Sequence, residues 1–152
     1  YGRENVVRNN IFACGAEGQL RVSRDAKVRG GQGRYAIILE RNLIIGDGQP
    51  ALIWPAEPGS TEDTAVLFSQ GNLFWDLSGQ PVRCERRQGS EAVPAYSLGE
   101  MQARGLDVGS VEADPCCHDP RAGDFTLAAD SPALALGFKP IDLSTVGPRR
   151  KF

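Results

Sequence analysis

The sequence predicts an all-β protein, a parallel β-helix of about three rungs with a carboxy-terminal cap that contains one short helix. Three similar segments follow one another at a spacing of about 30 residues, and each holds two runs typical of β-strands. Glycine (18 residues) and proline (10 residues) are frequent enough to indicate many turns. Short strands at a fixed repeat, joined by turns, are typical of a solenoid.

The three segments align on Asn10, Asn42 and Asn72, which lie 32 and 30 residues apart. In each segment the residue four positions before the asparagine is apolar, and so are the two residues after it. The residue two positions before it is long and polar. A Gly-Gln pair then marks a turn, and apolar residues return ten and twelve positions after the asparagine. These are Leu20, Leu52 and Val82 at ten positions, and Val22, Trp54 and Cys84 at twelve.

Stacking explains how such short strands can fold. A strand of this length cannot bury a face alone, but equivalent strands stacked about 4.8 Å apart pair their backbones and share an apolar interior. Stacking also predicts a column of asparagine side chains whose amides hydrogen-bond to one another as a ladder. Two alternatives stay open: each asparagine takes a left-handed turn, or hairpins form a two-sheet sandwich, although a sandwich does not require this register.

The repeat ends near residue 88, which predicts rungs over residues 1–88 and a capping segment over residues 89–152. Ser97, with Glu100 three residues later, forms a capping box that starts a short helix, and Gly105 can end it. The last rung of a solenoid exposes unpaired backbone and apolar core. We therefore expect the segment after residue 88 to cover that rung.

Five stretches of the capping segment carry a resemblance to a known ending. They are residues 97–107, 110–115, 123–127, 130–133 and 137–142. They are similar to the carboxy-terminal end of bacterial right-handed parallel β-helix repeat proteins of the pectate-lyase-like superfamily. Cys116-Cys117 departs from that pattern, which usually has Leu-Phe at this place. The resemblance implies a right-handed helix, in agreement with the general rule for parallel crossovers.

Members of that superfamily mostly act on polysaccharides, as glycoside hydrolases or uronic-acid lyases, and are usually secreted by bacteria. The resemblance therefore implies the carboxy-terminal portion of a secreted carbohydrate-active protein, with most of its site in rungs upstream of this chain. It implies no cofactor. The alternative is a non-catalytic β-helix, a binding or surface module of the adhesin type. In either case the first rung exposes a sheet edge that upstream sequence or another chain would cover.

Two carboxylates are candidate catalytic residues. Asp25 and Glu57 each lie fifteen residues after their asparagine, so stacking would hold them about 5 Å apart on adjacent rungs, a separation that suits a retaining glycosidase. Repulsion between the two would raise the pKa of one of them. The third repeat has Arg87 at this position. The alternative is that both are ordinary carboxylates in turns.

A second set of candidates would bind substrate. Arg8, Glu40 and Gln70 share one position in the three repeats, which predicts an outward column suited to an extended sugar chain. The alternative is a solvated face on which Arg8 and Glu40 attract each other. Trp75 is a candidate platform for stacking on a sugar ring.

Other classes of site and partner have less support. A cluster of metal-ligand residue types, namely Asp114, Cys116, Cys117, His118, Asp119 and Asp124, lacks the spacing of a known zinc site, so we predict no metal. A net charge of −2 without a basic block argues against nucleic acid, and no apolar run is long enough to span a bilayer. The four cysteines are expected to be buried free thiols, with a disulfide as the alternative.

Overall fold

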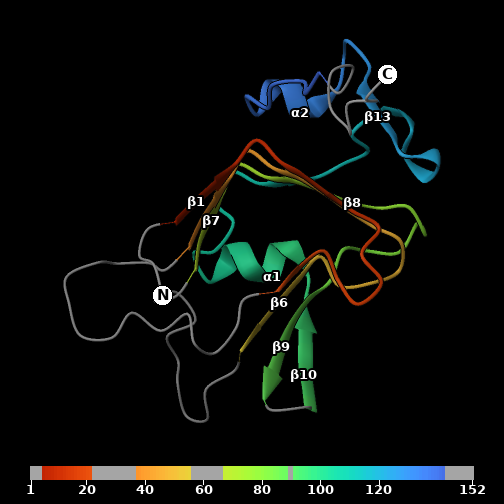
Figure 1. The fold of residues 1–152 in the computed structure, drawn as a ribbon. Helices are drawn as coiled ribbons and strands as arrows, with labels where there is room; N and C mark the ends of the chain where they lie inside the picture. The colour runs from red at the N-terminus through yellow and green to blue at the C-terminus, as the bar shows by residue number, and fades with distance from the viewer. Residues whose placement is uncertain (1–4, 22–36, 56–66, 89–90, 143–152) are drawn as a thin grey trace, which may run out of the picture.

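The structure, a computed structural model, describes residues 5–21, 37–55, 67–88 and 91–142. Its first strands follow one another in layers, each with three strands in the same order (Figure 1). The first layer comprises β1 (Asn5–Arg8), β2 (Ile11–Ala13) and β3 (Leu20–Arg21). The second comprises β4 (Ile37–Glu40), β5 (Leu43–Gly46) and β6 (Leu52–Pro55). The third comprises β7 (Leu67–Gln70), β8 (Leu73–Asp76) and β9 (Cys84–Gln88).

Equivalent strands of successive layers pair in parallel. Sheet A contains β1, β4 and β7, sheet B contains β2, β5 and β8, and sheet C contains β3, β6 and β9. In sheet A, Val6 lies beside Ile38 and Ile38 beside Phe68, which confirms the alignment predicted from the asparagines. The described chain is thus strand-rich and built on parallel sheets, as the all-β prediction requires.

The chain after β9 adds strands at the edges of two sheets and a separate hairpin. β10 (Glu91–Tyr96) pairs antiparallel with β9, and β11 (Val111–Glu112) pairs parallel with β8. The remaining elements are α1 (Leu98–Ala103), β12 (Cys117–Asp119), η3 (Pro120–Ala122), β13 (Asp124–Leu127) and α2 (Pro132–Ala135). The capping box at the start of α1 forms as predicted, with Ser97 and Glu100 bonded to each other's backbone amides. The predicted boundary at residue 88 stays a prediction.

The predicted asparagine ladder is confirmed. Asn10 donates from Nδ2 to Asn42 Oδ1 at 3.2 Å, and Asn42 donates from Nδ2 to Asn72 Oδ1 at 3.0 Å. The backbone amides of Asn10 and Asn42 donate to the same oxygens, at 3.0 and 2.9 Å. Asn42 and Asn72 are 1% and 0% exposed, so the ladder lies in the interior and satisfies buried polar groups of successive layers.

The alternative explanation of the asparagines, a left-handed turn at each of them, is wrong. The left-handed conformation falls on the residue before each asparagine: φ is 58° at Asn9, 53° at Arg41 and 59° at Gly71. Asparagine and glycine adopt this conformation readily, whereas arginine adopts it at a cost. The chain therefore turns the corner between sheets A and B at this preceding residue, which points the next side chain into the interior.

One part of the predicted alignment is wrong by two residues. Leu20 pairs with Leu52 as expected, but Leu52 pairs with Cys84 and not with Val82. The reason is the turn between β8 and β9, which has seven residues where the turn between β5 and β6 has five. Asp76 stabilises the longer turn, because its Oδ1 accepts hydrogen bonds from the backbone amide and the hydroxyl of Ser78.

The inward side chains of the three sheets form an apolar interior. Leu39 from sheet A, Ile44 from sheet B and Leu52 from sheet C are 3%, 1% and 1% exposed. Helix α1 lies across this interior beyond the third layer, and Met101 belongs to the same interior cluster as Leu67 and Cys84 of that layer. Figure 1, viewed along the stack, shows α1 between the three sheets. The helix occupies the place expected of the cap.

Residues 117–138 lie elsewhere, against the outer face of sheet B. Leu43 and Leu73, on that face, form one cluster with Ala133 and Phe138, and all four are at most 4% exposed. Figure 1 shows α2 and β13 outside the sheet and away from α1. Sheet B is therefore buried on both faces, which explains why β5 is apolar at every position but its last, Gly46.

Asp107 ends the ladder with a carboxylate. Its Oδ1 accepts hydrogen bonds from Ser69 Oγ at 2.6 Å, Ser110 Oγ at 2.9 Å and Asn72 Nδ2 at 3.3 Å. Its Oδ2 is buried and has no hydrogen-bond partner in the described part of the chain. Burial raises the pKa of Asp107, although these hydrogen bonds act in the opposite direction. The folded protein therefore holds a proton on Asp107 more strongly than the unfolded chain does.

We predict that Asn42→Ala lowers the free energy of unfolding by about 2 to 4 kcal/mol, because each buried polar group left without a partner costs roughly 1 to 3 kcal/mol. The substitution removes the acceptor of the Asn10 amides and the donor to the Val7 carbonyl. Denaturant titration measures the loss. Asn10→Ala, at the exposed end of the ladder, is the matched control and should cost less than half as much. Equal losses would contradict the ladder as the main constraint.

The raised pKa of Asp107 predicts a pH dependence of stability. As the pH rises above the ordinary carboxyl value of 3.8, the unfolded chain loses this proton first, so the folded state loses stability relative to it. The isosteric Asp107→Asn variant has no carboxyl group at this position and therefore lacks this contribution to the pH dependence of stability. The stability of the unmodified protein minus that of the variant should therefore fall as the pH rises, measured by thermal unfolding between about pH 4 and pH 8. A difference that rises with pH would show that Asp107 is ionised more readily in the fold.

Candidate functional site

The outer face of sheet A carries two adjacent columns of side chains. Side chains alternate between the two faces of a strand, and Val7, Leu39 and Leu67 belong to the interior cluster. Their neighbours along the strands therefore face outward. One set, called here the apolar column, consists of Val6, Ile38 and Phe68; the other, the polar column, consists of Arg8, Glu40 and Gln70.

The polar column is joined by contacts from layer to layer. The Arg8 guanidinium donates from Nε and Nη2 to Glu40 Oε1, and Gln70 Nε2 lies 3.5 Å from Glu40 Oε2. The hydrogen bonds from Arg8 hold the pKa of Glu40 below its usual value. Glu40 is therefore ionised at neutral pH and balances the charge of Arg8. The column as a whole is neutral and presents hydrogen-bonding groups in place of a net charge.

The apolar column lies beside the polar column and reaches solvent. Val6 is 53% exposed, and Ile38 and Phe68 are half-buried. Beyond the third layer, Val108 forms a bridge with Gln70 and is 60% exposed, so apolar surface continues toward α1. Sugar rings have apolar faces and polar edges, and binding sites combine apolar contact with a few placed polar groups. The two columns together therefore place apolar and hydrogen-bonding groups side by side on one outer face.

The three residues of the predicted polar column come together, whereas Trp75 does not join them. Trp75 is half-buried on the outer face of sheet B, where it packs in the cluster with residues 117–138. Asp25 and Glu57 lie outside the described residues. Phe68 lies on the same outer face of sheet A, but the sequence alone did not mark it as a candidate site residue. The alternation of β7 was the available signal, because Gln70 faces outward and Phe68 is two residues before it.

The residues of metal-ligand types form their contacts within local turns and within the hairpin of β12 and β13. Cys116 N donates to Asp114 Oδ1 at 2.8 Å, and His118 Nδ1 lies 2.9 Å from Asp124 Oδ2. Within the described ranges, no group of three or more histidine, cysteine or acidic side chains is placed to hold a metal ion. The four cysteines are unpaired in the structure; Cys84 is buried, but Cys14 and Cys116 are exposed, so the expectation of buried thiols is wrong for these two. Burial raises the pKa of Cys117 to about 11, which makes its thiolate rare at neutral pH.

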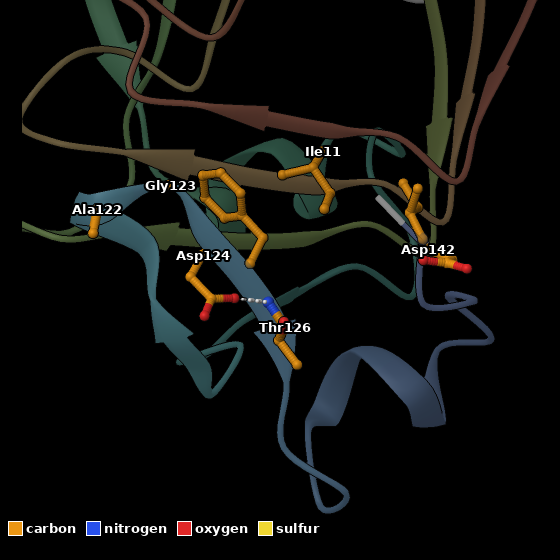
Figure 2. A pocket seen from close by; sticks show the side chains of 8 residues that line it. Ile11, Ala122, Gly123, Asp124, Thr126 and Asp142 are labelled. Atoms are coloured by element: carbon orange, nitrogen blue, oxygen red, sulfur yellow. Dashed lines mark hydrogen bonds between the residues drawn. The ribbon is translucent and has the colours of Figure 1, made fainter. Parts of the chain in front are cut away.

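A groove of about 470 Å³ lies between β13 and the first layer of sheet B (Figure 2). Its lining residues are Ile11, Ala122, Gly123, Asp124, Phe125, Thr126, Ile141 and Asp142. The Asp124 carboxylate accepts a hydrogen bond from the Thr126 amide at 3.0 Å, the contact drawn in Figure 2, and also pairs with His118. Hydrogen bonds with Thr126 and the charge of His118 keep the pKa of Asp124 below its usual value. This carboxylate therefore links β13 to β12 through its pair with His118.

No protein-family model, curated protein or solved structure matches the chain. Among the described residues, none of the helices has the length and apolar character needed to cross a membrane.

Proposed function

We propose that this chain is the carboxy-terminal part of a secreted, bacterial, right-handed parallel β-helix that binds polysaccharide along the outer face of sheet A. Layered parallel sheets with a shared interior and an asparagine ladder support the β-helix. The resemblance of residues 97–142 to endings of the pectate-lyase-like superfamily supports the handedness, the secretion and the bacterial origin.

The adjacent apolar and polar columns of sheet A are the observation that carries the proposal. Layers of a parallel sheet repeat about every 4.8 Å, so a glycan lying along the stack would meet one apolar and one polar side chain per layer. The neutral charge of the polar column favours a neutral, hydroxyl-rich chain over a polyuronate. The outer face of sheet B is covered by residues 117–138, which makes sheet A the better candidate of these two sheets.

Cleavage of the glycan, as by a glycoside hydrolase or a lyase, is the part of the proposal that rests on Asp25 and Glu57. On the described outer face of sheet A, Glu40 is the only carboxylate, and Arg8 holds it in an ion pair. Glycoside hydrolysis generally uses two carboxyl groups. This observation favours, as a second candidate, a β-helix module that binds glycan without cleaving it.

Binding can be tested with affinity electrophoresis of the 152-residue chain on a panel of neutral and acidic polysaccharides. We expect retention by a neutral glycan, and about tenfold weaker retention for Phe68→Ala, since loss of a buried aromatic contact at an interface commonly costs more than about 1 kcal/mol. Gln70→Ala should weaken retention about threefold.

Arg121→Gln, which removes an exposed ion pair with Asp47 on a turn after sheet B, is the matched control and should bind as the unmodified protein does. Thermal unfolding of each variant shows whether it is folded. If retention is unchanged in both sheet A variants, the outer face of sheet A is not the binding site.

Turnover separates the two candidate functions. In the protein with its upstream rungs, an enzyme should release reducing ends or unsaturated products from the bound glycan, and Asp25→Asn and Glu57→Gln should each lower the rate at least about a hundredfold, the usual scale of general acid–base catalysis. Retention should persist in both variants. Binding without product release would favour the non-catalytic module.

A further inference from the structure

Within the described residues, the first layer leaves one end of the stack without a covering layer. β1, β2 and β3 are the edge strands of their sheets, and all three edges lie at the same end. Val7, Phe12 and Leu20 of this layer are half-buried, whereas their partners one layer further in are almost fully buried. The apolar interior therefore reaches the surface here, beside backbone groups that can pair with another strand.

The ladder has a direction, which specifies what can cover this end. Each buried amide oxygen of the ladder accepts two hydrogen bonds from the layer before it, one from a backbone amide and one from Nδ2. Among the described residues, none donates to the Oδ1 of Asn10. The Nδ2 groups of Asn42 and Asn72 donate to the carbonyls of Val7 and Leu39, each in the preceding layer. Asn10 Nδ2 donates instead to Arg8 of its own layer.

A second copy of the chain does not satisfy these groups. The far end of the stack is closed, because Asp107 accepts the last ladder amide and Met101 and Leu98 of α1 are buried over the interior. A far end therefore cannot dock on an open end. Two open ends meeting about a two-fold axis would run β1 antiparallel to its copy and bring two Asn10 Oδ1 acceptors together, a pairing without donors.

We propose that the open end is the docking surface for one further β-coil of the same repeat, which runs parallel to β1 and places an asparagine over Asn10. The backbone amide and Nδ2 of that asparagine donate to Asn10 Oδ1. The carbonyl three residues before it accepts from Asn10 Nδ2. Apolar side chains of the coil cover Val7, Phe12 and Leu20.

Such a coil can be joined in cis ahead of β1 by the connection that the described layers already use. In the described layers the chain leaves sheet C and re-enters sheet A in the next layer, from β3 to β4 and from β6 to β7. A preceding coil that leaves its own strand of sheet C reaches β1 by the same step. This inference rests on the β-helix part of the proposed function, and it does not depend on glycan binding.

The test is a fusion protein in which a copy of residues 5–36, one full 32-residue repeat, precedes residues 5–152. Hydrogen exchange followed by mass spectrometry is measured on peptides that cover β1 and β2 of the original first layer. We expect exchange there to slow at least about tenfold relative to the 152-residue chain, with the protection of β8 and β11 unchanged.

The matched variant carries Asn10→Asp in the added copy only. The carboxylate has the same shape but cannot donate to the acceptor below it, so the gain in protection should be lost. A fusion that leaves β1 and β2 unprotected, or that disturbs β8 and β11, would overturn the proposal. So would equal protection from the Asp variant, or a dimer of the unfused chain in sedimentation that already protects β1.

Discussion

The buried ladder of asparagine amides at the corner between sheets A and B is the interaction on which this fold depends. Parallel strands can slip past one another by two residues without exchanging their faces. Such a slip would move the Asn42 amide away from the Asn72 oxygen and leave both buried without partners, at a cost that short strands cannot recover elsewhere. The ladder therefore selects one register out of several that backbone pairing alone would allow.

The same register creates the candidate site. Because the asparagines stack, the residues two and four positions before them must stack as well, and alternation turns both sets outward. A sequence constraint that is purely structural thus produces two columns of functional groups on an outer face. The chemistry of the outer face of sheet A can change while the interior stays the same. Arg8, Glu40 and Gln70 differ in charge and size, but each lies two residues before its asparagine.

Features set by distance from an asparagine could be predicted from the sequence, whereas features set by a second constraint could not. The parallel register of sheets A and B, the outward polar column and the capping box at Ser97 depend on local spacing and belong to the first group. The Leu52–Cys84 pairing belongs to the second, because a Gly-Gln pair occurs in turns of five and of seven residues alike. The role of Asp107 was also missed, since a single carboxylate in a sequence does not reveal which buried amide it will accept.

The surroundings of the predicted site residues also depend on contacts that local spacing does not set. Trp75 stays a predicted platform for a sugar, and the structure shows it half-buried beside residues 117–138. A strand that is apolar on both faces indicates cover on both sides, but the sequence does not show where that cover lies. The segment that provides it, residues 117–138, has the composition of an end cap and packs on a side face. Only the contacts of Ala133 and Phe138 with sheet B show that this segment packs on the side of the stack and not on its end.

That side-packed segment changes how the stack can come apart. In a linear array of repeats each unit contacts only its neighbours, so terminal units can fray while the middle stays folded. Here Asn9 of the first layer exchanges two hydrogen bonds with the backbone of Lys139, while Val111, close before the same segment, pairs with Leu73 of the third layer. One strap thus spans the array from end to end. The strap therefore adds contacts that oppose fraying of the first layer.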